Sequence, residues 1–506
     1  MEASVLRPEI DEFRRLAATG NLIPVYTELA ADYETPISAF EKIKDGTDCF
    51  LFESAEKSDQ VGRYSFLGSR PRLVFRCCGQ QVEIIEDRRE RRVLEVDGDP
   101  LRELERVMSR FDPVVANDLP VFHGGAVGYI GYDSVRYFEP TVGEGPPDEL
   151  GVPDILFLVT DTLIVFDHRF RRMQVVANVY TEEHESLEAA YESGREKIAG
   201  LIRKLEKPLQ FKPLELTGGE PANLEPSSNT SQTEYEDMVT RGKEYIHAGD
   251  IFQFVPSQRF EVGYEGTAID FYRALRHVNP SPYMFCLEFG EDGFSVVGSS
   301  PEVHVRCLQG KVEIRPIAGT RWRGKTVAED DALAEDLLSD PKELAEHIML
   351  VDLARNDVGR IAKFDSVTVT DFKIIEKYSH VMHIVSDVVG RLKDGMSAYD
   401  VMRATFPAGT VSGSPKIRAM QIINEFEKHK RGVYAGAVGY FGFDGNLDSC
   451  IALRTAVLKG GKVYVQAGAG VVADSIPERE YEETVNKAKA LIRAVARARE
   501  LGKGSS

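Results

Sequence analysis

The chain repeats itself once, on the scale of a domain. Residues 64–84 and 294–314 align over 21 positions, of which nine are identical. Farther along, residues 125–133 read GAVGYIGYD and residues 436–444 read GAVGYFGFD. In each half a strand-like stretch and then an acidic-to-basic helical run follow. Such a repeat leaves few choices of fold, because both halves must be built on one scaffold of strands with helices outside.

The duplication predicts the fold class and the domain organisation. We expect an α+β fold of two intimately packed domains, made of duplicated β-sandwich-like sheets with helices outside. A polar segment with four prolines predicts a linker over 206–233, between an N-terminal domain (1–205) and a C-terminal domain (234–506). A length of 506 residues agrees with two cores rather than one.

The two halves differ by one large insertion. The spacing between the repeated blocks is 81 residues longer in the second half, and the extra chain carries Glu346 and His383. Three of its stretches have a helical pattern: 341–361, 396–405 and 416–427. In the first block, Glu302 takes the position that Arg72 has in the other copy. These differences predict that the second half carries the chemistry and that the first half has another task.

Composition excludes several classes of function. The formal net charge of −19 and the pI near 5.2 argue against a nucleic-acid partner. No apolar run approaches the ~18 residues that a membrane helix needs, and the start MEASVLRPEIDEF has no pattern of a secretory signal. The six cysteines form no CxxC pair and no disulfide framework. We therefore expect a reduced, cytoplasmic protein.

Two helix-borne carboxylates are candidate metal ligands. Asp340, Pro341 and Glu343 predict a helix start with a capping box, and Glu346 lies one turn farther along the same helix. Glu483 has a similar position on the last helix. Two such carboxylates, with waters and substrate oxygens, suit Mg²⁺, which takes oxygen ligands. On the residues alone, surface salt bridges are the alternative.

Candidate contacts for an anion lie in two glycine loops and one strand. The loops Gly319-Thr320 and Gly468-Ala469-Gly470 have bare backbone, so their N–H groups can approach a carboxylate. Arg454 lies in a strand-like run, where its guanidinium needs an anion or an internal salt bridge. Residues 468–473 also fit a dinucleotide-binding fingerprint. That reading is disfavoured because no further strand with an acidic residue follows.

Six motifs, taken in order, carry a family resemblance: RPIAGT (315–320), ELAEH (343–347), YSHVMH (378–383), FPAGTVSGSPK (406–416), QAGAG (466–470) and YEETVN (481–486). The chain thus resembles the chorismate-utilising enzymes, most closely the large subunit of anthranilate synthase, over nearly its whole length. The resemblance implies the α+β fold of two packed domains expected above. It also implies a Mg²⁺ ion bound by Glu346 and Glu483. It also implies chorismate bound by Gly319, Thr320, Tyr434, Arg454, Gly468, Ala469 and Gly470.

Two positions separate the reactions within this family. Gln253 stands where isochorismate and salicylate synthases have a lysine that activates water, and Ala318 stands where aminodeoxychorismate synthases have a lysine nucleophile. The resemblance then implies attack by ammonia, with Glu302 as general acid and His383 assisting the elimination of pyruvate. The alternatives are one of those other chorismate enzymes, or a non-catalytic subunit that senses tryptophan.

The resemblance also implies a partner and an inhibitor. No cysteine lies in the G-x-C-x-G turn of a glutaminase, so ammonia is expected from a separate glutamine amidotransferase subunit, in a heterotetramer. LFESA (51–55) and NPSPYMF (279–285) resemble the segments that enclose tryptophan, the feedback inhibitor, in the family. We therefore expect tryptophan at Ser54, Pro282, Tyr283 and Met284, and a role in tryptophan biosynthesis.

Overall fold

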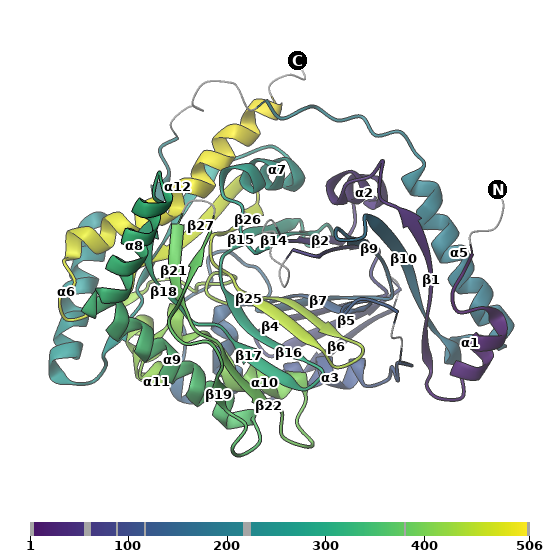
Figure 1. Ribbon diagram of the computed structural model, residues 1–506, viewed down its shortest axis with the longest axis horizontal. Coiled ribbons are helices and arrows are strands. Elements are labelled where there is room, and N and C mark those ends of the chain that lie inside the picture. Colours follow the sequence, from purple (N-terminus) through teal and green to yellow (C-terminus); the bar gives the residue numbers. More distant parts are fainter. Residues whose placement is uncertain are drawn as a thin grey trace.

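Two large β-sheets lie one above the other and helices cover their outer faces (Figure 1). The structure is a computed structural model, and it describes residues 5–54, 62–87, 90–115, 118–215, 224–378 and 381–502. Helices and antiparallel sheets both contribute, so the expected α+β class is confirmed. Part of the predicted linker (216–223), Ala55, and Ser379 and His380 of the YSHVMH motif lie outside the described residues.

Within the described residues, the first sheet has eleven strands. Their order is β1 (Leu22–Ala30), β10 (Arg172–Tyr180), β9 (Thr162–Asp167), β3 (Tyr64–Ser69), β2 (Cys49–Glu53), β14 (Tyr283–Phe289), β15 (Phe294–Ser300), β26 (Thr455–Lys459), β27 (Lys462–Gly468), β13 (Ser257–Gly263) and β11 (Ser227–Ser228). Every pairing is antiparallel.

The second sheet also has eleven strands in the part of the chain that the structure describes. Their order is β19 (Thr368–Val369), β22 (Val388–Arg391), β17 (Lys311–Ile314), β16 (Val303–Leu308), β25 (Leu447–Ile451), β24 (Ala437–Gly442), β7 (Gly125–Ile130), β8 (Ile155–Thr160), β4 (Leu73–Cys78), β5 (Gln81–Glu86) and β6 (Glu90–Glu95). Two small sheets are β18 (Ile317–Trp322), β21 (Val381–Val385) and β20 (Ile374–Lys377), and β12 (Gln253–Phe254) with β23 (Gly413–Ser414).

The helices complete the element list. They are α1 (Ile10–Leu16), α2 (Pro36–Ile43), α3 (Leu101–Met108), α4 (Val135–Phe138), α5 (Leu187–Leu205), α6 (Gln232–Ala248), α7 (Ala268–Val278), α8 (Val327–Ser339), α9 (Pro341–Ile361), α10 (Ala398–Thr405), α11 (Lys416–Phe426) and α12 (Pro477–Gly502). Short 3₁₀ turns are η1 (Tyr132–Ser134), η2 (Pro140–Val142), η3 (Thr181–Glu183) and η4 (Gly409–Val411). Of the described helices, none combines the length and apolar character needed to span a membrane.

The strand order confirms the duplication. From the middle of the first sheet outward, β2, β3, β9, β10 and β1 mirror β14, β15, β26, β27 and β13. The same holds in the second sheet for β7, β8, β4 and β5 against β24, β25, β16 and β17. We call β1 to α5 the N-terminal copy and β13 to α12 the C-terminal copy. The copies meet where equivalent strands pair, β2 with β14 and β7 with β24, and we call these two pairings the seam.

Strand alternation explains why both faces of the sheets are buried. In β2, Phe50 belongs to an apolar cluster that includes residues of both sheets, and the neighbouring Leu51 belongs to one that includes residues of α2, α5, α7 and α12. Residues i and i+1 of a strand point to opposite faces, so one strand contributes side chains to two apolar cores. A third cluster joins the second sheet to α9 and α10. The seam is therefore held by apolar packing as well as by strand pairing.

The insertion of the C-terminal copy lies between β17 and β24 (green in Figure 1). The helix predicted over 341–361 matches α9, with Pro341 in its first turn. Asp340 caps it by accepting the N–H groups of Lys342 and Glu343 at 3.0 and 3.4 Å. The expected capping box is wrong, because the Glu343 carboxylate does not return to Asp340: it lies 3.6 Å from Arg321.

Candidate active site

One lysine of α12 links three of the predicted site residues. The Lys487 ammonium lies 2.7 Å from the Glu483 carboxylate and donates at 3.0 Å to the carbonyl oxygen of Gly468, at the end of β27. Its charge also acts on the pKa of Glu302. The last helix, the glycine loop after β27 and the turn before β16 therefore converge on one place in the C-terminal copy.

Glu302 is a buried carboxylic acid. It precedes β16, and the single bond to its side chain in the described structure comes from the Thr410 hydroxyl, 2.7 Å from Oε1. Its side chain is almost fully enclosed, with 6% of the residue exposed. Burial raises the pKa of Glu302 to about 7, because the ionised form loses its hydration, and the Thr410 bond and Lys487 offset this only in part. A carboxyl group with this pKa can hold and release a proton near neutral pH.

His383, in β21, is held in one tautomer. Its Nδ1 lies 2.8 Å from the carbonyl oxygen of Gly319 and 3.2 Å from the Thr320 hydroxyl. A carbonyl can only accept, so Nδ1 carries the proton and Nε2 keeps its lone pair. Burial lowers the pKa of His383, and the nearby charge of Arg454 lowers it further. The lowered pKa favours the neutral imidazole, and no described residue bonds to Nε2, which can accept a proton.

Arg454 is a half-buried cation with no carboxylate partner among the described residues. It directly precedes β26 and has φ of +45°, in the left-handed region that non-glycine residues seldom adopt. Its carbonyl oxygen accepts the N–H of Ser299 at 3.1 Å. Its guanidinium has no hydrogen bond or ion pair with any other described residue, and burial lowers its pKa. Such a group has five donors to offer to an incoming anion.

The expectation of a loop at Gly319-Thr320 is wrong, because these residues lie within β18 at a register shift between Ala318 and Arg321, whereas Ala469 and Gly470 follow β27 as expected. Gly319 has φ of +65°, and a Cβ there would lie 2.8 Å from a methyl of Leu337. A Cβ on Gly470 would lie 2.7 Å from the Gln253 amide nitrogen. Ala469 is fully buried between Gly468 and Gly470, and the Tyr434 hydroxyl bonds to the Gly468 backbone. Thr320 is exposed, beside His383.

Two pairs of glutamates border the same place. Glu346 of α9 accepts a hydrogen bond from Gln253 at 3.1 Å, and Glu483 faces Lys487. Three residues earlier on each helix stands another glutamate, Glu343 or Glu480, and the pKa of each is raised by burial and by its partner's charge. Within the described ranges, no three His, Cys, Asp or Glu side chains are grouped as a ready-made metal cage. The arrangement fits a cation that also takes waters and substrate oxygens.

The residues predicted to bind the inhibitor lie together at the seam. Glu53, at the end of β2, is directly opposite Met284, near the start of β14. The Ser54 hydroxyl is buried and has no hydrogen-bond partner in the described structure. Pro282 is half-buried, and Tyr283 donates its hydroxyl to Asp448 at 2.8 Å. An unpartnered buried hydroxyl is costly, so Ser54 offers a bond to a ligand.

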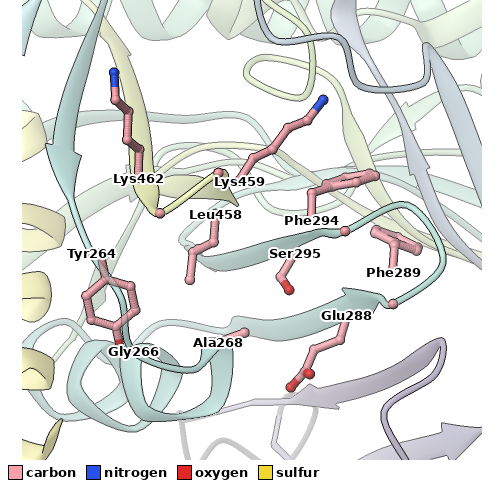
Figure 2. Close-up of a pocket in the computed structure, with 14 residues that line it drawn as sticks. Tyr264, Gly266, Ala268, Glu288, Phe289, Phe294, Ser295, Leu458, Lys459 and Lys462 are labelled. Atoms are coloured by element: carbon pink, nitrogen blue, oxygen red, sulfur yellow. The ribbon is translucent and has the colours of Figure 1, made fainter.

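A cavity of about 250 Å³ elsewhere does not belong to this site. It lies among the turns after β14 and β26 and the start of α7 (Figure 2). Both of its lysines are already bonded, Lys459 to the carbonyl oxygens of Leu150 and Gly151 and Lys462 to Glu261. In Figure 2 their ammonium groups point away from the labelled Ser295 and Glu288. The remaining ionisable group of its lining, Glu288, lies 3.7 Å from the Lys44 ammonium, so the described lining offers no unpaired charge to define a ligand.

Sequence reasoning missed three groups of the site: Lys487, Thr410 and Glu480. Lys487 was detectable, because it follows Glu483 by four residues on one helix, the spacing of a helical ion pair. Thr410 lies within a recognised motif, but only the fold brings it 2.7 Å from Glu302. The predicted catalytic, substrate-binding and metal-binding residues lie in the C-terminal copy, and the predicted inhibitor-binding residues lie at the seam.

Comparison with known proteins identifies the family. A model of the chorismate binding enzyme family matches residues 47–493. The chain belongs to the chorismate binding enzyme family. Among similar family members, anthranilate synthase component 1 of Pseudomonas putida is 50% identical over 491 residues, covering 96% of this chain and 98% of that protein. The component 1 of Aquifex aeolicus is 49% identical over 497 residues, covering 98% and 99%.

Solved structures agree with this placement. The crystal structure of anthranilate synthase component I from Streptococcus pneumoniae superposes with a TM-score of 0.75 at 38% identity, covering 92% of this chain and 99% of that one. The menaquinone-specific isochorismate synthase of Escherichia coli gives a TM-score of 0.67 at 18% identity, covering 96% and 98%. This second match shows that the fold is shared across the family.

Proposed function

We propose that the chain is the large subunit of an anthranilate synthase, which converts chorismate and ammonia into anthranilate and pyruvate as the first committed step of tryptophan biosynthesis. The observation that carries this proposal is a buried, protonatable Glu302 in one site with an unpaired Arg454 and a neutral His383. Relatives named anthranilate synthase component 1 over nearly the full length support the same assignment.

Arg454 and the two glycine segments, 319–320 and 468–470, bind the substrate in this proposal. Chorismate carries two carboxylates, and a half-buried guanidinium without a partner among the described residues attracts such an anion. Gly319 and Thr320 lie against His383, Gly468 ends β27, and Ala469 and Gly470 follow it. The Ala469 N–H already donates to the Pro256 carbonyl oxygen at 3.2 Å, so further donors come from the Gly470 N–H and the Tyr434 hydroxyl. The absence of a Cβ at Gly319 and Gly470 lets the substrate approach the backbone, and at Gly319 the positive φ of +65° favours glycine as well.

Glu302 and His383 divide the proton transfers. Glu302, protonated, donates to the departing ring hydroxyl, which leaves as water while ammonia attacks. Its pKa of about 7 suits an acid that works near neutrality. His383 has Nδ1 engaged with Gly319, so Nε2 is the atom that accepts a proton during the elimination of pyruvate. The two groups thus have opposite protonation states at one pH, as the acid and base of one reaction require.

Mg²⁺ is the cation that the two glutamate pairs suit. Glu346 and Glu483 would hold it, one from α9 and one from α12, with waters and substrate oxygens completing the shell. The excess negative charge from Glu343 and Glu480 supports this, since a cation would relieve the like-charge contacts that raise their pKa values. When bound, Mg²⁺ neutralises a substrate carboxylate and polarises it.

Ala318 and Gln253 disfavour the other reactions of the family. Ala318 is a buried methyl group in β18, which cannot form a covalent adduct. Gln253 is not a base, and its amide is already bonded to Glu346. Neither residue can replace the lysine on which a water-activating or adduct-forming enzyme depends. A purely tryptophan-sensing subunit would have no use for the protonatable Glu302.

The proposed ammonia source is a separate glutamine amidotransferase subunit, in a heterotetramer. The component 1 name of the relatives points to a second component. Burial raises the pKa of all six thiols, so none has the low thiol pKa of a glutaminase nucleophile. Activity with ammonium salts is expected from the chain alone, and activity with glutamine only after the second subunit is added.

Tryptophan is the proposed feedback inhibitor, bound at Ser54, Pro282, Tyr283 and Met284. The seam links this place to the substrate arginine by a short bonded path. The Ser299 hydroxyl donates to the carbonyl oxygen of Asn279, and the Ser299 N–H donates to the carbonyl oxygen of Arg454. A ligand that shifts the 279–284 segment therefore shifts Arg454, which supplies the differential contact that inhibition at a distance requires.

One assay tests the assignment. The purified chain is incubated with chorismate, Mg²⁺ and ammonium, and the product is identified by chromatography and fluorescence. Anthranilate and pyruvate in equal amounts are expected. Isochorismate, salicylate or aminodeoxychorismate would assign one of the other family reactions, and unchanged chorismate would mean a non-catalytic subunit.

A further inference from the structure

A small polar cavity lies beside Glu302. Its volume is about 30 Å³, more than a single water needs, and Leu353 and the half-buried residues 408–410 form part of its wall. Polar side chains of five residues line it: Glu302, His304, Asp357, Thr405 and Thr410. A cavity with several polar groups holds water, whereas an apolar one of the same size stays dry.

Asp357 leaves one carboxylate oxygen unused in this cavity. Only 5% of the residue is exposed. Its Oδ2 lies 2.7 Å from the Lys416 ammonium, which also donates to the Thr405 carbonyl at 3.1 Å. No described residue bonds to its Oδ1, which is not fully enclosed and so is accessible to water. Water in the cavity is the partner that this oxygen lacks.

His304 forms a neutral wall. Its ring nitrogens lie 3.3 Å from the Ser449 hydroxyl and 3.4 Å from the Thr405 hydroxyl. Burial lowers the pKa of His304 to about 3, so the imidazole carries no charge near neutrality. The groups in this cavity that can exchange a proton are therefore Asp357, the water and Glu302.

Glu302 must recover a proton in every turnover of the proposed reaction. It gives its proton to the departing hydroxyl, and bound substrate then covers the active-site side. We propose that Asp357 and the cavity water return this proton to Glu302 from solvent. The Asp357 carboxylate takes a proton from solvent water and passes it to the cavity water, which in turn protonates the Glu302 carboxylate.

The cations around the two acids favour proton transfer from Asp357 to Glu302, because more of them face Asp357 and favour its ionised form. Lys487 faces Glu302, while Lys416 and Arg360 face Asp357. The proton consumed is balanced by the one that the attacking ammonia loses on forming its bond to carbon. This inference rests on the proposed function. The competing source of the proton is the substrate itself, if Glu302 removes a ring proton directly.

The test is a rapid-mixing assay of Asp357→Asn with chorismate, Mg²⁺ and ammonium. At about pH 7, a pKa of about 7 leaves about half of Glu302 protonated. The variant is expected to form about half an equivalent of anthranilate at the wild-type rate, then to turn over at least about tenfold more slowly. The size of this burst should fall as the pH rises. Asp352→Asn, an exposed aspartate on the same helix, is the matched control and should behave as wild type.

A second variant tests whether the slow phase of Asp357→Asn results only from loss of the Asp357–Lys416 ion pair. Ala354→Val adds two methyl groups to the cavity wall and leaves both acids and Lys416 unsubstituted, and it should give the same burst and slow phase. Equal slowing of both phases, or wild-type turnover in both variants, would overturn the proton route. Wild-type protein that makes no anthranilate would instead refute the proposed function, so the two failures are distinguishable.

Discussion

The N-terminal and C-terminal copies have one scaffold but treat their charges in opposite ways. In the N-terminal copy, Asp161 directly precedes β9 and lies 2.7 Å from Lys197 of α5. In the C-terminal copy, Arg454 directly precedes β26, the counterpart of β9, and has no described partner. Lys197 and Lys487 each stand ten residues after the first residue of their helix. The position that is closed by an internal ion pair in one copy is therefore open to a ligand in the other.

The turn before β4 and its counterpart before β16 show the same contrast. Arg72 forms an ion pair with Glu183 and packs over the rings of Phe111 and Tyr180. Glu302, its counterpart, is held in a buried site by one hydroxyl. Satisfied charges contribute to the fold, whereas an unpaired arginine and a desolvated acid cost stability. The copy that bears this cost is the one proposed to catalyse.

The metal ligands should give the largest effect. Glu346→Gln and Glu483→Gln each keep the side-chain shape but remove the negative charge that Mg²⁺ needs, so we expect Mg²⁺-dependent turnover to be abolished and the fold retained. Turnover and circular dichroism are measured across a magnesium titration. Near-normal activity of either variant at ordinary magnesium would remove that residue from the site.

Loss of the acid comes next. Glu302→Gln cannot donate to the leaving hydroxyl, and we expect kcat to fall by about 10²–10⁴. Arg72→Gln, at the equivalent position of the N-terminal copy, is the matched control and should leave kcat unchanged. A comparable loss in both variants would mean that the turn matters for folding in either copy, not for chemistry in one.

Glu302→Gln should also be more stable than the wild-type protein at high pH. Because the folded-state pKa of Glu302 is raised to about 7 from 4.5, the group stabilises the protonated folded protein and this contribution is lost as the pH rises through 7. Glutamine never ionises, so at pH about 9 Glu302→Gln is expected to exceed wild type by roughly 3 kcal/mol in free energy of unfolding, and at pH about 4 to match it. Denaturant unfolding at the two pH values measures the difference. The same difference in free energy of unfolding between Glu302→Gln and wild type at both pH values would refute the raised pKa.

Arg454 gives a smaller effect, on binding. Arg454→Ala removes charged hydrogen bonds to the substrate, each worth about 1.5–3 kcal/mol, so KM for chorismate should rise at least about tenfold with a smaller change in kcat. Asp161→Asn in the N-terminal copy should leave KM unchanged and cost about 1 kcal/mol or less, since Lys197 is partly exposed. An unchanged KM in Arg454→Ala would place substrate binding elsewhere.

Much of this contrast could be predicted from the sequence. The repeat gave the shared scaffold and the Glu302–Arg72 exchange, because identical residues at fixed spacing report equivalent positions. The helix α9 was predictable from Asp340 and Pro341, which define its start locally. Contacts between distant segments were not predictable: Thr410 reaches Glu302, and Ser299 bridges Asn279 and Arg454, only because the strands pair in a particular register.

The seam gives the smallest effect on catalysis, and it tests whether the N-terminal copy regulates. Ser54→Phe should fill the space beside Met284 and block tryptophan, while uninhibited turnover stays close to wild type, because no described bond joins Ser54 to the active site. Ser54→Ala, the matched control, loses one hydrogen bond of about 0.5–1.5 kcal/mol, roughly a tenfold change in inhibition at most. Tryptophan titrations of ammonium-dependent activity measure both variants. Inhibition curves that superimpose on the wild-type curve for Ser54→Phe would place the inhibitor away from the seam, and the open and closed charge sites of the two copies would then need another explanation.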